Sequence, residues 1–308
     1  MVLGVITVLS GGVGAARLLQ ALSRHVSPNE LCAVVNVGDD LVLHGLVICP
    51  DLDTITYTLA GLNNEELGWG LTGESWRVMK ELGELGGESW FGLGDRDLAT
   101  HLYRTQRMSL GATKAEVADE LRKHHGVLVK ILPVTNDHVA TLFETEVGRL
   151  TFQEYFVKHH HGVVVNEVLI EGAANATPTP GVLDALTSAS KIVIAPSNPM
   201  ISIEPILQVP QIRDILKSRR SDVVAVSPII NGAAIKGPAD RLLSELGHDV
   251  SALGVVDYYG DLVGTWIIDE QDAALSSAIT DRGHRVIVTT TIMAQVENAD
   301  RLAQAVLR

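Results

Sequence analysis

The chain has 308 residues, of which 46% are hydrophobic, and carries a formal net charge of −13 at pH 7. This length allows one large domain or two intimate ones. The negative charge argues against nucleic acid and anionic membrane as main partners, and no uninterrupted apolar run approaches the roughly 18 residues of a membrane span.

Short β-branched apolar runs recur along the chain and predict buried strands, and helix-period stretches lie between many of them. Such alternation predicts a Rossmann-like α/β fold, with a mostly parallel sheet covered by helices on both faces. The predicted strands are Val5–Leu9, Leu31–Val37, Ile192–Ala195, Val223–Val226, Gly254–Val256 and Val286–Thr289. The predicted helices include Ala15–Arg24, Ile212–Lys217, Asp240–Leu246 and Gln295–Arg308.

The middle of the chain is mostly helical and then hairpin-like. Asp95 stands where it could cap one helix, and Thr113 with Glu116 resembles the capping box of the next. The following stretch alternates around Gly148, as a hairpin does. The predicted domains are an inserted lid subdomain, residues 62–176, and a Rossmann-like nucleotide-binding core, residues 1–61 and 177–308.

Four loops rich in glycine, proline and small polar residues follow predicted strands. Ligands bind beyond the carboxyl ends of the strands in an open parallel sheet, so these loops should line one crevice. The four loops are Ser10–Ala16 (SGGVGAA), Asn36–Asp40 (NVGDD), Pro196–Pro199 (PSNP) and Ser227–Ala239 (SPIINGAAIKGPA).

The first loop suits an anion. Gly11, Gly12 and Gly14 let the backbone approach a phosphate, and the helix that follows presents free N–H groups and the positive end of its dipole. The loop departs from the dinucleotide fingerprint, and no Gly-Lys-Ser/Thr of a Walker loop follows it. A tight strand–helix turn is therefore the alternative to phosphate binding.

Four aspartates, Asp39, Asp40, Asp51 and Asp53, lie within fifteen residues of one another in an otherwise apolar stretch. Carboxylates this dense repel one another unless water or a cation neutralises them. Beside a phosphate loop, Mg²⁺ would take one or two of them together with phosphate oxygens. The alternative is a solvated loop in which Asp53 caps a helix over Thr54–Leu62.

A cluster of tryptophans and a run of histidines each allow a structural and a functional interpretation. Trp69, Trp76 and Trp90 lie within about twenty residues and could be core residues or a stacking wall for a flat ring. The run His159–His161 is more typical of a solvated helix end than of a metal site, because neighbouring residues on a helix point in different directions.

The expected location of the protein is the cytoplasm. Its two cysteines, Cys32 and Cys49, lie in apolar runs without zinc-site spacing, which favours buried free thiols. The start of the chain also lacks the basic flank and the cleavage site of a secretory signal.

Seven stretches, spread from residue 10 to about residue 262, together resemble one family. They are SGGVGAARLL, NVGDD, CPDLDT, FGLGDRDLATHL, APSNPMISIEPIL, SPIINGAAIKGPA and DYYGDL. The chain resembles the 2-phospho-L-lactate transferases of deazaflavin coenzyme F-420 biosynthesis, which are phosphoenolpyruvate transferases in actinobacteria. ICPDLDT and LGDRDLATHL together are the most specific of these matches.

The resemblance implies a Mg²⁺-dependent enzyme that is usually a homodimer. The donor would be a guanosine diphosphate ester of phospholactate or of its enolpyruvyl counterpart. The acceptor would be 7,8-didemethyl-8-hydroxy-5-deazariboflavin, whose terminal ribityl hydroxyl attacks the donor phosphorus and displaces GMP. The residues of the stretches NVGDD and WFGLGDRD resemble those of the actinobacterial branch, which favours the enolpyruvyl donor.

The resemblance also implies roles for residues at matching positions. Asp39 and Asp53 would be the catalytic residues, and Asp39 would bind the metal with Asp40 or Asp51 as helpers. The acceptor would contact Asp53, Trp90, Gly92 and Asp95, although Gly92 stands where some relatives carry a lysine and could contact it only through backbone. The donor would contact Gly11, Gly12, Val13, Gly14, Asn36, Ser197, Asn198, Ser227 and Lys236.

Two other protein classes compete with this interpretation. A nucleotide-sugar-binding regulatory protein of related fold would be expected to lack the segments CPDLDT and GLGDRDLATH, which are present here. An NAD-dependent dehydrogenase would need a better fingerprint and an acidic residue at the end of the second strand.

Overall fold

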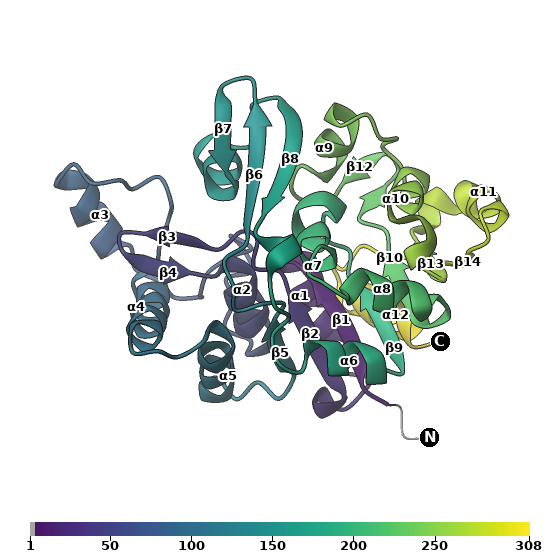
Figure 1. The fold of residues 1–308 in the computed structure, drawn as a ribbon, viewed down its shortest axis with the longest axis horizontal. Coiled ribbons are helices and arrows are strands. Elements are labelled where there is room, and N and C mark those ends of the chain that lie inside the picture. The colour runs from purple at the N-terminus through teal and green to yellow at the C-terminus, as the bar shows by residue number, and fades with distance from the viewer. Residues whose placement is uncertain (1–3) are drawn as a thin grey trace.

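A computed structural model describes residues 4–308, and its centre is a seven-stranded parallel sheet (Figure 1). The strands, in sheet order, are β14 (Arg285–Val288), β13 (Thr265–Ile268), β10 (Val223–Val226), β9 (Lys191–Ile194), β1 (Ile6–Ser10), β2 (Leu31–Val35) and β5 (Lys130–Pro133). The strand order reverses beside β1, which pairs with β2 on one side and with β9 on the other. Such a reversal opens a crevice at the carboxyl ends of the strands.

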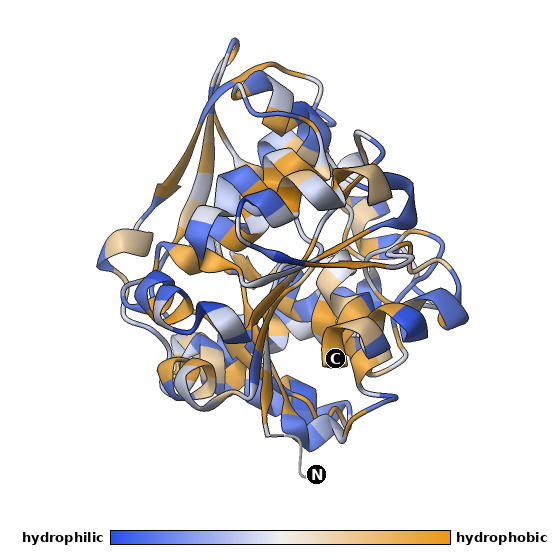
Figure 2. Ribbon diagram, turned by 90° about the vertical axis from the view of Figure 1, so that its right-hand side faces the viewer, coloured by the Kyte–Doolittle hydropathy of each residue, from blue (hydrophilic) through white to orange (hydrophobic). Residues whose placement is uncertain are grey.

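Helices bury both faces of this sheet, so the predicted Rossmann-like α/β fold is confirmed. Successive residues of β2 belong to opposite cores: Ala33 packs with one cluster and Val34 with the other. This two-sided burial explains the unbroken apolar runs of the strands, which cross the middle of Figure 2 in orange. One core includes α1 (Val13–Leu22), α2 (Pro50–Leu59), α5 (Lys114–His124) and α12 (Val296–Leu307); the other includes α6 (Val182–Ser188), α8 (Ile212–Ser218), α9 (Ala239–Glu245) and α10 (Ala252–Tyr259).

Smaller elements extend from two sides of the sheet (Figure 1). On one side, the hairpin β3 (Leu41–Leu43) and β4 (Leu46–Ile48) lies beside α3 (Arg77–Glu84) and α4 (Asp95–Ser109). Above the sheet, an antiparallel sheet contains β6 (Ala140–Thr145), β7 (Gly148–Thr151) and β8 (Val165–Glu171). The remaining elements are α7 (Glu204–Leu207), α11 (Ser276–Asp281) and the short pair β11 (Ile229–Ile230) and β12 (Ala233–Ala234).

Two local predictions about the middle of the chain are confirmed. Thr113 and Glu116 form a capping box at the start of α5, where each side chain accepts from the backbone N–H of the other residue. The alternation around Gly148 is an antiparallel pair of β6 and β7. Asp95, by contrast, is the first residue of α4 rather than its cap, because Gly94 holds the cap position.

One predicted strand is wrong, and two strands of the main sheet were not predicted. Gly254–Val256 lies inside helix α10, where the Ser251 side chain accepts from the Gly254 N–H as a cap. Periodicity cannot separate a short, fully buried helix from a buried strand. The missed strands are β5 and β13, which are only four residues long.

Strand β5 bears on the predicted domain division. It lies inside the range 62–176, yet it pairs in parallel with β2 at the edge of the main sheet. The chain therefore leaves the sheet after β2, returns for β5, and leaves again for β6–β8 before it reaches β9. The boundaries of the lid subdomain stay a prediction.

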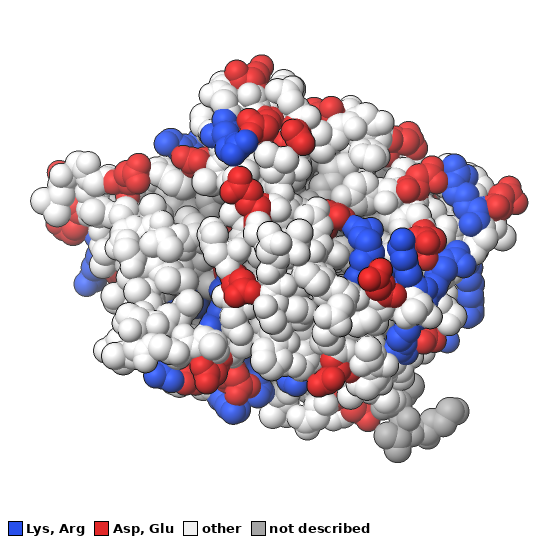
Figure 3. Space-filling model, viewed as in Figure 1, with Lys and Arg blue, Asp and Glu red and all other residues white. Residues whose placement is uncertain are grey.

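Surface charge and helix length give two further facts about residues 4–308. In Figure 3, lysines and arginines are interspersed with aspartates and glutamates over the visible face, without one broad basic field. In the described part of the chain, no helix combines the length and the apolar character that crossing a bilayer requires.

Candidate active site

A cavity of about 720 Å³ lies at the carboxyl ends of the central strands. Its walls come from the loops after β1, β2, β9 and β10, the first turns of α1 and α2, and the segments before α4 and after β14. The predicted site residues that line it are Gly12, Val13, Gly14, Asp39, Asp51, Asp53, Gly92, Ser197, Asn198, Ser227 and Lys236. Those that do not line it are Gly11, Asn36, Asp40, Trp90 and Asp95.

Close packing explains why glycine is needed at two positions of the first loop. A side chain at Gly11 would place its Cβ 2.5 Å from the Cβ of Ser202, and one at Gly14 would strike the carbonyl oxygen of Pro196. These two glycines therefore let α1 start directly against the loop that follows β9. Gly12, at the cap position of α1, has no side chain to accept from the first N–H groups of the helix. Phosphate binding there stays a prediction.

Asp39 and Asp51 form a pair of buried carboxylates that both line the cavity. The Asn36 side-chain amide donates to Asp51 Oδ2 at 3.0 Å and to Asp39 Oδ1 at 3.4 Å. Burial, and then the charges of neighbouring aspartates, hold the pKa of Asp39 well above its usual range. Burial likewise raises the pKa of Asp51 to about 7.

No lysine, arginine or histidine forms an ion pair with Asp39 or Asp51 among residues 4–308. The pair therefore lacks positive charge, and its oxygens are the ligands that Mg²⁺ prefers. These residues fit the metal role that was predicted for them.

Asp40, the third predicted metal ligand, has a different environment. Its Oδ2 lies 2.5 Å from Nζ of Lys114, and the two side chains are 10% and 8% exposed. Burial has the largest single effect and would lower the pKa of Lys114, but the charge of Asp40, its hydrogen bond and the nearby Cys49 together raise that pKa. Asp40 already has its cation, and its role as a metal ligand stays a prediction.

Asp53 is not a helix cap, which corrects one of the two interpretations of this residue. Helix α2 begins at Pro50 with Cys49 at the cap position, so Asp53 lies at the end of the first turn. Proline suits the first position of a helix, and it starts α2 one turn earlier than the predicted boundary. The Asp53 carboxylate forms a buried ion pair with Arg104 of α4 instead. Burial raises its pKa, and Arg104 opposes that effect.

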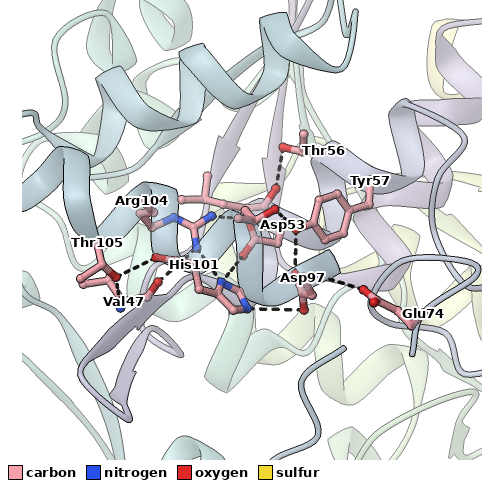
Figure 4. A network of polar contacts seen from close by, with 11 residues as sticks. Val47, Asp53, Thr56, Tyr57, Glu74, Asp97, His101, Arg104 and Thr105 are labelled. Atoms are coloured by element: carbon pink, nitrogen blue, oxygen red, sulfur yellow. Dashed lines mark hydrogen bonds and ion pairs between the residues drawn. The ribbon is translucent and has the colours of Figure 1, made fainter. Parts of the chain in front are cut away.

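Asp53 and Arg104 belong to a buried polar network between α2 and α4 (Figure 4). His101 lies with Nδ1 3.8 Å from Asp53 Oδ2 and with Nε2 3.4 Å from Asp97 Oδ2. The Tyr57 hydroxyl donates to Asp97 Oδ1 at 2.7 Å. Burial acts to raise the pKa of Asp97, but the contact with His101, the hydrogen bond from Tyr57 and the charge of Arg104 together lower that pKa.

The predicted aromatic wall is present in part. Trp69 and Phe91 line the cavity, and Trp69 packs edge to face on Trp76 with ring centroids 5.8 Å apart. A Cβ at Gly92 would lie 3.1 Å from the Trp69 ring, so glycine lets the backbone approach the indole. Trp90 lies outside the cavity lining.

Asp95 and the histidine run take no part in the cavity. The Asp95 carboxylate accepts from the Ser75 hydroxyl and from the Val78 N–H, and so fastens the preceding loop to the start of α4. The run His159–His161 follows a single turn of π-helix, Glu154–Lys158, and is partly exposed.

Comparison with known proteins identifies the family. A family model described as 2-phospho-L-lactate transferase CofD matches residues 6–304. The chain belongs to the CofD family. It is 40% identical to a phosphoenolpyruvate transferase of Kitasatospora aureofaciens, over 98% of this chain and 96% of that protein. It is 36% identical to a 2-phospho-L-lactate transferase of Methanocaldococcus jannaschii, over 98% and 97% of the two chains.

Membership of the CofD family makes the chain a transferase rather than a dehydrogenase or a regulatory protein. Among solved structures, a UPF0052-family protein of Bacillus halodurans has a TM-score of 0.64 at 20% identity, with 100% of both chains covered. At this identity the likeness concerns the fold alone.

Sequence reasoning missed several residues of this CofD-family cavity. Two of them are Asp97 and His101, which line the cavity. With Arg104 of the adjoining network they are spaced by four and three residues, so the three share one face of α4. This spacing within the stretch RDLATHLYR could have predicted that the side chains lie close together. Arg17 of α1 also lines the cavity, and neither it nor Lys236 has an ion-pair partner in the part of the chain that the structure describes. These two cations favour an anionic ligand.

Substituting Lys114 tests the pairing that orients the loop after β2. Lys114→Met should lower the free energy of unfolding by about 3–5 kcal/mol, because it leaves Asp40 without its cation. The double variant Asp40→Asn/Lys114→Met should recover most of this loss. Urea unfolding of the three proteins measures the difference. Equal losses in the single and the double variant would contradict a charge effect.

The pH dependence of stability tests the charge state of Asp51. The unfolded chain protonates Asp51 near pH 4, whereas the folded protein does so at about pH 7. Between these values the folded state binds more protons, so the free energy of unfolding falls as the pH rises. Without divalent cations, calorimetry should therefore give a higher Tm at about pH 6 than at about pH 8.

Asp51→Asn is the control for this measurement. It should make the Tm less dependent on pH over this interval and should weaken the stabilisation that Mg²⁺ gives the wild-type protein at about pH 8. A variant with the same pH dependence as the wild type would show that Asp51 titrates normally.

Proposed function

We propose that this CofD-family transferase moves a phosphorylated three-carbon acid from its guanosine diphosphate ester to a ribityl hydroxyl of 7,8-didemethyl-8-hydroxy-5-deazariboflavin, releasing GMP, in coenzyme F-420 biosynthesis. The carrying observation is that one cavity is lined by two cations without an ion-pair partner within residues 4–308, by the Asp39–Asp51 pair and by aromatic rings. Such a lining suits a reaction with an anionic donor and a flat, hydroxylated acceptor.

The cations and N–H donors of this cavity would hold the diphosphate and the guanosine. Lys236 and Arg17 supply positive charge, and the open N-terminus of α1 supplies N–H donors. Small polar side chains after β9 and β10, Ser197, Asn198 and Ser227, line the same cavity. The amide nitrogen of Asn198 and the hydroxyl of Ser197 are buried without a hydrogen-bond partner within residues 4–308. Both atoms are therefore available to a ligand.

Asp39 and Asp51 would hold Mg²⁺ against the donor phosphates. When bound, the ion supplies charge neutralisation on the diphosphate, which is a main requirement of phosphoryl and phosphodiester transfer. Asn36 orients both carboxylates, and its own Oδ1 accepts from the Gly38 N–H at 2.8 Å. This arrangement leaves the chain's own cations free to contact the nucleotide.

The aromatic and acidic side chains of the cavity would hold the acceptor. Trp69 and Phe91 offer apolar ring surfaces for the deazaflavin, and Asp53 lines the same cavity. In the transfer, an acceptor hydroxyl oxygen forms a bond to the donor phosphorus that bears the three-carbon acid. The bond from that phosphorus to the oxygen shared with GMP breaks, GMP leaves, and the hydroxyl proton passes to Asp53 as general base.

The enolpyruvyl donor is our choice between the two acids. The relative from Kitasatospora aureofaciens, at 40% identity, carries the name phosphoenolpyruvate transferase, and the relative from Methanocaldococcus jannaschii, at 36%, is named for phospholactate. Assaying the purified protein with each synthesised donor and the deazaflavin decides the question. Formation of GMP and product with neither donor would overturn the proposed function. The homodimer and the cytoplasmic location stay predictions.

Asp39→Asn tests the metal role. Turnover should fall by about 100-fold or more, because one charge of the metal-binding pair is lost where several kcal/mol of transition-state stabilisation are needed. Asp214→Asn, at an exposed position of α8, is the matched control and should leave turnover unchanged. The measurement is kcat at saturating Mg²⁺. A near-normal kcat for Asp39→Asn would remove this residue from the mechanism.

A further inference from the structure

Two polar atoms in the network between α2 and α4 have no hydrogen-bond partner within residues 4–308. They are Asp53 Oδ2 and His101 Nε2. Asp53 is 6% exposed and His101 is 1% exposed, and both residues line the cavity. Buried polar groups are almost always satisfied, so two orphan atoms on residues that line one cavity indicate a ligand that completes them.

Arg104 determines which of the two atoms is a donor. A guanidinium can only donate, and Arg104 Nη1 lies 3.2 Å from His101 Nδ1 (Figure 4). Nδ1 must therefore accept, and in the neutral ring the proton resides on Nε2. The same guanidinium donates to the other oxygen of Asp53. Asp53 Oδ2 is thus an acceptor without a donor. His101 Nε2–H is a donor that lies 3.4 Å from Asp97 Oδ2 without forming a hydrogen bond to it.

A metal ion is the competing ligand for this corner. One nitrogen of His101 and one oxygen each of Asp53 and Asp97 lie within 4.8 Å of one another. Arg104 nevertheless already donates to both Asp53 and His101, and the remaining ring nitrogen carries a proton. A cation would have to displace Arg104, a buried charge, or the proton on Nε2. The geometry therefore favours a neutral group that both donates and accepts.

We propose that Asp53 and His101 form a hydroxyl-binding site for the polyol chain of the acceptor, with His101 as a further substrate-binding residue. This inference rests on the proposed function. An alcohol oxygen would donate to Asp53 Oδ2 and accept from His101 Nε2–H, which satisfies both orphan atoms with one group. A carboxylate or a phosphate would meet Asp53 with like charge, so the site selects a hydroxyl over an anion.

The surrounding residues keep the two atoms in place. Asp97 lies 3.4 Å from Nε2 through its Oδ2, and its backbone N–H donates to Glu74 at 2.9 Å. The Tyr57 hydroxyl donates to the other Asp97 oxygen at 2.7 Å. The site is therefore formed before the acceptor arrives, which lowers the entropy lost on binding.

Two substitutions at His101 separate its two nitrogens. In His101→Asn, the amide oxygen can replace Nδ1 as the acceptor for Arg104, but no donor reaches the position of Nε2. In His101→Gln, the longer side chain can bring its NH₂ group to that position. His101→Asn should weaken binding of 7,8-didemethyl-8-hydroxy-5-deazariboflavin about tenfold. His101→Gln should recover much of the loss. Fluorescence titration of the deazaflavin measures both.

An acceptor analogue with an alkyl chain in place of the ribityl chain completes the test. Wild type and His101→Asn should bind this analogue equally, since it offers no hydroxyl. GDP affinity should stay near the wild-type value in both variants, which a collapse of the whole cavity would not allow.

Several results would overturn the inference and leave the proposed function standing. One is an active wild-type enzyme whose His101→Asn variant keeps the wild-type acceptor affinity. Another is an equal loss of affinity for both acceptors. A third is calorimetric Mg²⁺ or Zn²⁺ binding that His101→Asn abolishes while acceptor binding is kept. A wild-type protein that transfers nothing from either donor to the deazaflavin overturns the proposed function itself.

Discussion

The burial of carboxylates at one end of the sheet is the constraint on which the rest of the site depends. A carboxylate withdrawn from water needs a positive charge nearby, or it takes up a proton. The two largely buried aspartates with a permanent cationic partner are Asp40, with Lys114, and Asp53, with Arg104. Asp39 and Asp51 share only an amide and remain open to the cavity. The fold thus divides one acidic cluster into fixed structural pairs and one pair that still needs a cation.

This division gives the carboxylates around one cavity two different roles. Elements from distant parts of the chain supply the fixed cations: Lys114 begins α5, and Arg104 lies near the end of α4. They also hold those elements against the loop after β2 and against the first turn of α2. Ion pairs that assemble the walls of the cavity therefore also decide which carboxylates face it. Stability and specificity depend on the same few contacts.

The sequence predicted what local chemistry controls and missed what only packing decides. The apolar runs revealed most of the parallel sheet because strands buried on both faces leave no polar alternation. The capping box of Thr113 could be predicted because its two residues lie within four positions of the sequence. The prediction of a strand at Gly254–Val256 was wrong because a short buried helix has the composition of a strand. The partners of Asp40 and Asp53 lie 74 and 51 residues away, so no local pattern indicates them. His101 was within a recognised motif, but its orphan nitrogen is visible only in three dimensions.

The position of β1 at the centre of the sheet has a consequence for biosynthesis of the protein. Strand β1 and the glycine loop are synthesised well before β9, at residues 191–194, which is one neighbour of β1. Helix α1 packs against α12, at residues 296–307, which is synthesised later still. The crevice beside β1 should therefore be complete only after residues 296–307 have been made. Shorter translation products then lack the packed walls of the cavity.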